Sequence, residues 1–221
     1  MRYLPIFLDL RGASGVVVGG GEAAFHKCKV LLEAGARVTV VSPTLVPEFA
    51  PLLAHESCRH VSRNYQRGDL HGCRIAVVAT DDPTVQEAVV TEANERGVLV
   101  NAVDRPDLCA FVMPAILSRG DIVIAVGTSA TSPGFAAALR DRIGRWLGPE
   151  YVAALGIARV LRERWQSGKI PMEERRRRSR LLLEEDFLAA LRRGDVAAVQ
   201  KSISSIEGEE VELPSLQGLS S

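Results

Sequence analysis

The sequence predicts an α/β fold in which a parallel sheet is followed by a small α+β segment and a helical C-terminal region. Short apolar runs alternate with segments of helical periodicity as far as residue 101. Two apolar runs then follow each other with no helix between them, and from residue 132 onward the pattern is helical. The length of 221 residues is enough for one or two domains.

The first half of the chain predicts the parallel sheet. The apolar run 15–19 predicts a strand, residues 22–35 a helix that ends at Gly35, and residues 37–42 a second strand. The alternation continues with a weaker strand at 60–65, a strand at 75–80, a helix at 83–96 and a strand at 98–101. Pro83 and Gly97 suit the two ends of that helix. Strands joined by helices in this way form a parallel sheet covered on both faces.

The pattern changes near residue 114, where we expect a domain boundary. Residues 110–117 and 121–128 are apolar runs separated by three residues, which predicts an antiparallel hairpin. Ser132 suits the N-cap of a helix that runs to residue 148. Further helices are expected at 149–167, 171–193 and 195–205, followed by a flexible acidic tail at 207–221.

Composition excludes several classes of protein. Basic and acidic side chains balance at 27 each, so the chain has no net charge to attract nucleic acid or an anionic membrane. No apolar run reaches the roughly 18 residues of a membrane span, and the first residues do not have the pattern of a secretion signal. The four cysteines lack metal-site spacing. We therefore expect a cytoplasmic protein without a structural metal.

A glycine motif follows the first strand. Gly19, Gly21 and Ala24 match G-x-G-x-x-A at the point where the strand ends and the helix begins, which is the dinucleotide signature of a Rossmann-type domain. Glu22 and Ala23 open the helix, whose free N–H groups would hold a pyrophosphate. The alternative is an ordinary glycine-rich turn in another doubly wound protein.

Other polar residues follow the later strands. The second strand ends at Ser42, followed by Pro43 and Thr44, at the position where a carboxylate usually contacts the ribose of NAD. Because Ser42 is neutral, the choice between NAD and NADP stays open. The remaining cofactor-binding candidates at strand ends are Thr80, Asp81 and Asn101.

The aspartates after two of the predicted strands can be either structural or functional. Asp81 and Asp82 precede the helix at 83–96, so at least one of them is expected to cap it. Asp104 follows the strand at 98–101 and is either a general base or a turn residue.

Five segments together resemble a known family. They are "LPIFLDLRG" (4–12), "VVGGGEAAFHKCKVLLEAGARVTVVSP" (17–43), "AVVATDDPTVQEAV" (76–89), "NAVDRPDLCAFVMPAIL" (101–117) and "IAVGTSATSPGFAAALRDRI" (124–143). Over roughly residues 2–200 the chain resembles the precorrin-2 dehydrogenase and sirohydrochlorin ferrochelatase proteins of siroheme synthesis. It resembles the stand-alone form, without the methyltransferase domain of the fused enzymes.

The resemblance implies an organisation and a reaction. It implies an NAD-binding Rossmann domain at 1–114, a dimerisation segment at 115–148 and a helical domain at 149–206, assembled as a homodimer. The implied reaction is NAD-dependent oxidation of precorrin-2 to sirohydrochlorin, followed in bifunctional members by insertion of Fe(II) or Co(II). By position, Asp104 matches the family's essential acid and is the expected catalytic residue.

The substrate so implied carries eight carboxylates and requires cationic and N–H donors. The candidates that would bind it are Arg105, Thr128, Ser129, Thr131 and Ser132. The arginine run 175–178 either joins them or forms a solvated helix face. A second class of function stays open, a non-catalytic module that senses NAD(H).

Overall fold

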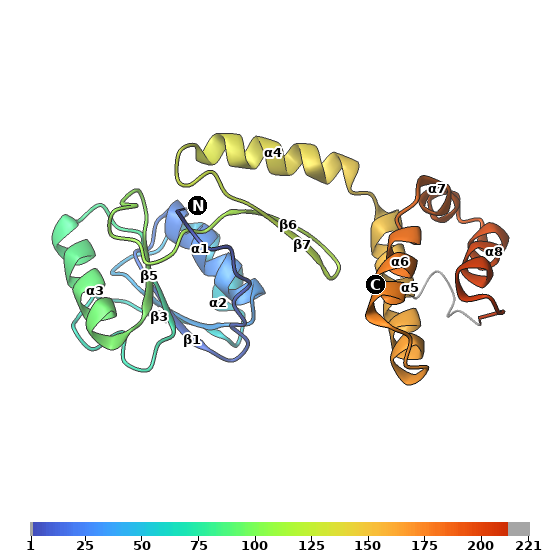
Figure 1. The fold of residues 1–221 in the computed structure, drawn as a ribbon. Helices are drawn as coiled ribbons and strands as arrows, with labels where there is room; N and C mark the ends of the chain where they lie inside the picture. Colours follow the sequence, from blue (N-terminus) through green and yellow to red (C-terminus); the bar gives the residue numbers. More distant parts are fainter. Residues whose placement is uncertain (1, 212–221) are drawn as a thin grey trace. The chain divides into compact units, whose positions relative to one another are not determined.

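The computed structural model describes residues 2–211 of the chain. The chain divides into two compact units between Met113 and Pro114, and each unit is described by itself (Figure 1). Within residues 2–211, no helix is both long enough and apolar enough to cross a bilayer.

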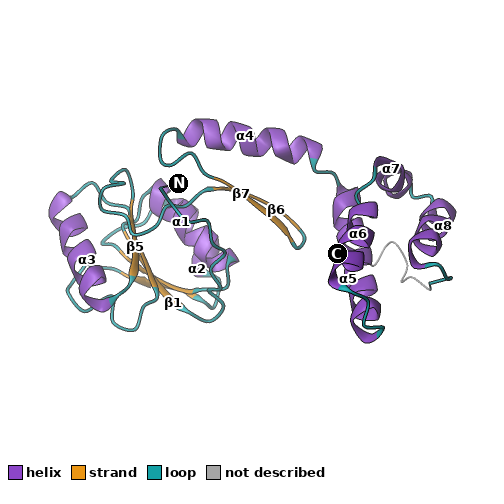
Figure 2. Ribbon diagram, in the orientation of Figure 1, coloured by secondary structure: helices purple, strands orange, loops and turns teal. Residues whose placement is uncertain are grey.

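The first unit contains a five-stranded parallel sheet. Its strands are β1 (Ser14–Val18), β2 (Arg37–Val41), β3 (Cys58–Val61), β4 (Ile75–Val78) and β5 (Leu99–Ala102). They pair in the order β3-β2-β1-β4-β5, and every pair is parallel. This is the order of a doubly wound nucleotide-binding sheet, so the predicted fold class is confirmed. The order reverses between β1 and β4, and Figure 2 shows the strands as the central layer.

Helices cover both faces of this sheet because successive strand side chains alternate between the faces. Val17 packs in a cluster with buried residues of α1 (Glu22–Glu33). Val16 and Val18 point the other way and pack with residues of α3 (Pro83–Arg96). The expected bounds of α3 are confirmed, since Pro83 begins the helix and Gly97 ends it with φ of 67°. Two short helices that the sequence did not indicate follow β2, η1 (Pro47–Phe49) and α2 (Ala50–Leu53).

The second unit opens with the predicted antiparallel hairpin. It consists of β6 (Ala115–Arg119) and β7 (Ile122–Val126). The first strand begins five residues later than the apolar run at 110–117 suggested, because Phe111 and Met113 pack on the core of the first unit. The prediction was therefore wrong for residues 110–114. They are not part of a strand, and their apolar side chains at 111 and 113 pack on the core of the first unit.

The rest of the second unit is helical. Its helices are α4 (Pro133–Trp146), α5 (Pro149–Ser167), α6 (Met172–Leu181), α7 (Glu185–Arg193) and α8 (Val196–Glu207). Ser132 caps α4 as predicted, because its hydroxyl accepts a hydrogen bond from the Phe135 amide. The C-terminal helices enclose a core of their own that includes Ile157, Leu161 and Ile203.

The expected single helix at 171–193 is two helices. The chain turns at residues 182–184, between α6 and α7. Leu182 and Phe187 are both buried in one core. In a straight helix, residues five apart would point about 140° away from each other. The turn therefore lets both side chains reach the same core.

The expected flexible tail at 207–221 differs from the structure at its start. Glu207 is the last residue of α8, and Val211 is buried with its carbonyl oxygen accepting a hydrogen bond from Gln200 at 2.6 Å. Residues 212–221 of the expected tail lie outside the described residues.

Candidate functional site

A cavity of about 470 Å³ opens at the carboxyl ends of β1, β4 and β5. Ligands of open α/β sheets bind at this edge, next to the point where the strand order reverses. The cavity brings together seven of the predicted site residues, Gly21, Glu22, Ala23, Thr80, Asp81, Asp104 and Arg105. They come from the turn before α1, the turn before α3 and the segment after β5.

Three successive glycines form the turn between β1 and α1, and they have different roles. Gly19 has a φ of 120°, and a Cβ atom there would lie 2.1 Å from the Ala79 carbonyl oxygen. A Cβ atom at Gly20 would lie 1.9 Å from the carbonyl oxygen of Thr44. Gly21 has an ordinary backbone conformation, and a Cβ atom there would meet no other atom within 4 Å. The fold therefore requires Gly19 and Gly20, whereas Gly21 keeps the cavity open beside the helix.

The N-terminus of α1 is free to bind an anion. Gly21 is its N-cap, and no side chain accepts a hydrogen bond there. The first N–H groups of a helix lack partners within the helix, and its dipole favours negative charge at this end. A pyrophosphate fits this position, since Gly21 places backbone rather than a side chain at the wall of the cavity.

Ser42, Pro43 and Thr44 lie beside the glycine turn. The Ser42 hydroxyl is buried and donates to the Thr44 carbonyl oxygen at 2.7 Å. The carbonyl oxygen of Ser42 in turn lies 2.9 Å from Nε2 of His60. Because these contacts fix the turn against Gly20, the residues after β2 support the nucleotide turn through their backbone.

The adjacent aspartates after β4 have different environments. The Asp82 carboxylate accepts hydrogen bonds from the Thr84 and Val85 amides, so the capping interpretation is confirmed for Asp82. Asp81 is exposed and lines the cavity. The Thr80 carbonyl oxygen accepts a hydrogen bond from the side-chain amide of Gln86 at 2.6 Å, and this bond ties the turn before α3 to the helix.

Asp104 has an unusual backbone and an uncommitted side chain. Its φ is 60°, a conformation that costs an L-residue roughly 1–2 kcal/mol and that aspartate tolerates better than most. Among residues 2–211, no group donates a hydrogen bond to its carboxylate or forms an ion pair with it. The exposed carboxylate therefore lines the cavity free to act on a ligand.

The segment that carries Asp104 is held at its two ends. The Cys109 thiol donates to the Ala102 carbonyl oxygen at 3.1 Å, and burial raises the pKa of this thiol. The Asn101 amide donates to the Phe111 carbonyl oxygen at 3.0 Å. The side chain of Asn101 is thus used to close the loop, a role that its position at a strand end did not indicate.

Two cations belong to this edge of the sheet. Arg105 lines the cavity and forms a forked pair with Asp107, with N–O distances of 3.1 and 2.9 Å. Lys27, on α1, was missed from the sequence because a single lysine in a helix carries no distinguishing pattern. Burial lowers the pKa of the Lys27 ammonium, while the negative charge of Asp104 opposes that effect. Lys27 is therefore close enough to Asp104 for their charges to interact.

The predicted substrate residues of the second unit form the turn between β7 and α4. The Thr128 hydroxyl donates to the Ser132 carbonyl oxygen at 3.1 Å, and Ser132 caps α4. Ser129 has a φ of 53° and is exposed, as is Thr131. Two hydroxyls thus stabilise the turn, and two are available to a ligand.

The fold and the cavity define a Rossmann-type protein that binds a nicotinamide nucleotide. Residues 6–115 match the family described as "Putative NAD(P)-binding". The family and the free N-terminus of α1 support NAD as the cofactor, as the resemblance implies.

Comparison with known proteins shows which proteins the chain is similar to. It is 38% identical over 176 residues to a siroheme synthase of Stutzerimonas stutzeri, covering 80% of this chain and 38% of that protein. It is 42% identical over 163 residues to the siroheme synthase of Methylobacillus flagellatus, covering 74% of this chain and 35% of that protein. The chain thus spans well under half the length of these relatives.

A solved structure shares the fold. The chain superposes on "SirC, precorrin-2 dehydrogenase" with a TM-score of 0.74 and 24% sequence identity, covering 93% of this chain and all of that one. These matches confirm the resemblance of the chain's sequence motifs to the siroheme synthase proteins.

Proposed function

We propose that the protein catalyses the NAD-dependent oxidation of precorrin-2 to sirohydrochlorin, with Asp104 as the general base. One observation carries the proposal: the uncommitted carboxylate of Asp104 lines the same cavity as the free N-terminus of α1. The relation to siroheme synthases and the fold shared with a precorrin-2 dehydrogenase support it.

The reaction removes a hydride and a proton from the substrate. Bound NAD supplies the hydride acceptor. The N–H groups at the start of α1 would bind the pyrophosphate, and Gly21 would let it approach. The Asp104 carboxylate accepts the proton. Lys27 and Arg105 contribute positive charge near Asp104, which suits a substrate with several carboxylates.

Replacing Asp104 with asparagine tests the proposal because the amide keeps the size of the side chain and cannot accept the proton in the same way. We expect turnover of precorrin-2, followed anaerobically by sirohydrochlorin absorbance, to fall by about 10²- to 10⁴-fold. NAD affinity, measured by calorimetry, should stay close to that of the wild type. Glu33→Gln is a matched control, since Glu33 is an exposed carboxylate at the opposite end of α1.

Two results would contradict this assignment. Wild-type turnover in Asp104→Asn would remove Asp104 from the chemistry. Absence of NAD-dependent oxidation in the wild-type protein, together with intact NAD binding, would favour the sensing module instead. Metal insertion stays a prediction from the resemblance, and adding Fe(II) or Co(II) to the sirohydrochlorin formed, against a control without enzyme, tests it.

A homodimer through the hairpin and α4 is part of the proposal. A two-stranded sheet alone is of marginal stability and leaves both of its edges open. Its residues Ile116 and Val123 are exposed, as are Phe135 and Leu139 of α4. Such a set of exposed apolar side chains fits burial against a second copy.

Sedimentation velocity at micromolar concentration tests the dimer. A dimeric wild type and a monomeric Phe135→Glu, Leu139→Glu double variant are expected. Leu183→Glu is the control, because Leu183 is also exposed but lies between α6 and α7. A monomeric wild type would refute the proposed assembly.

A further inference from the structure

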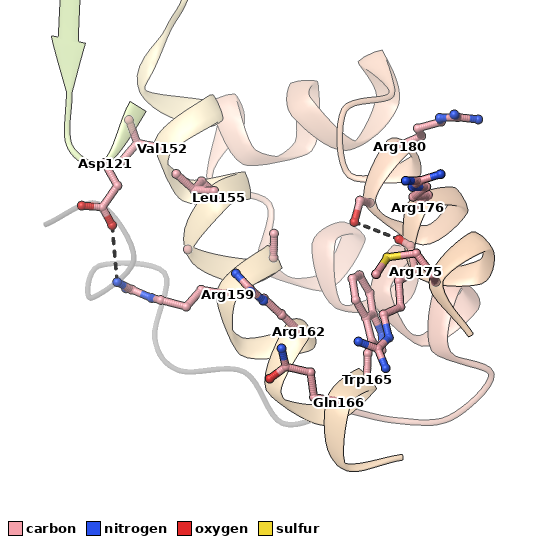
Figure 3. A pocket seen from close by; sticks show the side chains of 14 residues that line it. Asp121, Val152, Leu155, Arg159, Arg162, Trp165, Gln166, Arg175, Arg176 and Arg180 are labelled. Carbon is pink, nitrogen blue, oxygen red and sulfur yellow. Dashed lines mark hydrogen bonds and ion pairs between the residues drawn. The ribbon is translucent and has the colours of Figure 1, made fainter. Parts of the chain in front are cut away.

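The second unit has a cavity of about 770 Å³ between α5 and α6, with Asp121 of the hairpin turn at its edge (Figure 3). This volume is in the range of sites for organic molecules of moderate size. None of the residues that form the nucleotide cavity lines it.

Part of the cavity wall is apolar. It includes Leu155, Met172 and the ring of Trp165. The Trp165 indole is held in place, since its Nε1 donates to the Glu207 carboxylate at 2.9 Å and only 3% of the residue is exposed. The apolar surface open to a ligand is therefore supplied by Leu155 and Met172, which are 39% and 63% exposed, and the buried Trp165 ring supports that wall.

The polar part of the wall is strongly basic. Arg159 and Arg162 project from α5, and Arg175, Arg176 and Arg180 from α6 (Figure 3). Residues three or four apart share a helix face, which holds for Arg159 with Arg162 and for Arg176 with Arg180. Asp121 is the only carboxylate that lines the cavity within the described residues.

The arginines of the cavity are only partly neutralised by the protein. Arg159 pairs with Asp121 at 3.6 Å and Arg176 pairs with Glu173 at 4.0 Å. Arg177 and Arg178 each pair with Glu174, with N–O distances of 2.8 and 2.9 Å. In the described chain, the guanidinium groups of Arg162 and Arg180 make no hydrogen bond or ion pair. The protein itself therefore does not neutralise these two charges, and an anion in the cavity would do so.

We propose that this cavity binds an organic polycarboxylate with an apolar body. The guanidinium groups on the two helices would bind carboxylates at the edge of the ligand, and Leu155 and Met172 would contact its body. A small inorganic anion would contact few of these arginines and leave the apolar wall uncovered. This binding site goes beyond the proposed dehydrogenase site in the first unit.

Fluorescence of Trp165 tests the proposal. The chain contains two tryptophans, so Trp146→Phe leaves Trp165 as the only reporter. The probe is uroporphyrin, an aromatic macrocycle with carboxylates around its edge. We expect saturable quenching, with affinity at least about tenfold weaker when Arg162 and Arg180 are both glutamine, since each charged hydrogen bond contributes appreciably. Arg193→Gln is the control, because Arg193 is an exposed arginine outside the cavity, and its affinity should equal that of the parent.

Three outcomes would overturn the proposal. They are absence of saturable quenching, equal affinity in the double glutamine variant with circular dichroism unchanged, and full displacement of the probe by millimolar inorganic phosphate. The readout is binding and not turnover. Failure of the dehydrogenase assay would therefore leave this result standing, and the two proposals can be rejected separately.

Discussion

Substituting two adjacent glycines separates the requirements of the fold from those of nucleotide binding. In Gly20→Ala, the new methyl group would lie 1.9 Å from the Thr44 carbonyl oxygen and 2.7 Å from the Ser42 hydroxyl. Backbone must move to relieve such contacts, so we expect a loss of about 2–3 kcal/mol in the free energy of unfolding. For a unit of this size, that corresponds to a fall in Tm of roughly 10 °C or more.

Gly21→Ala should have the opposite profile. Its methyl group meets no atom within 4 Å, and its φ of −83° is open to alanine. The expected stability loss is below about 1 kcal/mol, from the poorer N-cap. The methyl group would enter the cavity beside the pyrophosphate position. Loss of one charge-assisted hydrogen bond, about 1.5–3 kcal/mol, would weaken NAD binding by about 10- to 160-fold.

Chemical denaturation and NAD calorimetry on both variants form the assay, with Gly20→Ala titrated well below its Tm. Undiminished NAD affinity in Gly21→Ala would refute the placement of the pyrophosphate at α1. Wild-type stability in Gly20→Ala would refute the steric reasoning about the turn.

Three further predictions concern stability. Ile157→Ala should cost about 2–5 kcal/mol in denaturant unfolding, since Ile157 is fully buried, and a loss under about 1 kcal/mol would mean that the core collapses around the gap. Asp82→Ala should cost about 0.5–2 kcal/mol through loss of the α3 cap, whereas Asp82→Asn should retain most of it. Arg177 and Arg178 lower the pKa of Glu174 from 4.5 to about 2, so its stabilising contribution is full above pH 4.5 and lost as the pH falls toward 2. Glu174→Gln should therefore have a lower Tm than the wild type at pH 7, with the difference closing near pH 2, and a constant difference would contradict the ion pairs.

Helix ends and strand positions were predictable where the signals are local. Pro83 and Gly97 bound α3 because each suits the backbone of its own position, and Ser132 caps α4 for the same reason. The buried strands were predictable because a strand covered on both faces is apolar throughout, as in Val16–Val18.

The errors fall where a neighbouring segment decides the outcome. Phe111 and Met113 are as apolar as a strand, but they pack on the core of the first unit instead of extending the hairpin. Leu182 and Phe187 continue a helical pattern in the sequence. In the structure the helix ends between them, because both side chains are buried in the same core. No residue at that break carries a local stop signal, since glycine and proline are absent from 182–184.

At the site, the sequence alone determined the glycine turn and the position of Asp104, because both are tied to the ends of strands that periodicity reveals. Only the tertiary structure decided that Asp104 is unpaired, that Asn101 is used in closing its loop, and that Lys27 lies near the carboxylate. The physical reason is that a carboxylate's availability depends on which donors surround it in space. The segments around Asp104 are α1, β5 and the loop after β5, and no single stretch of sequence encodes how they approach one another.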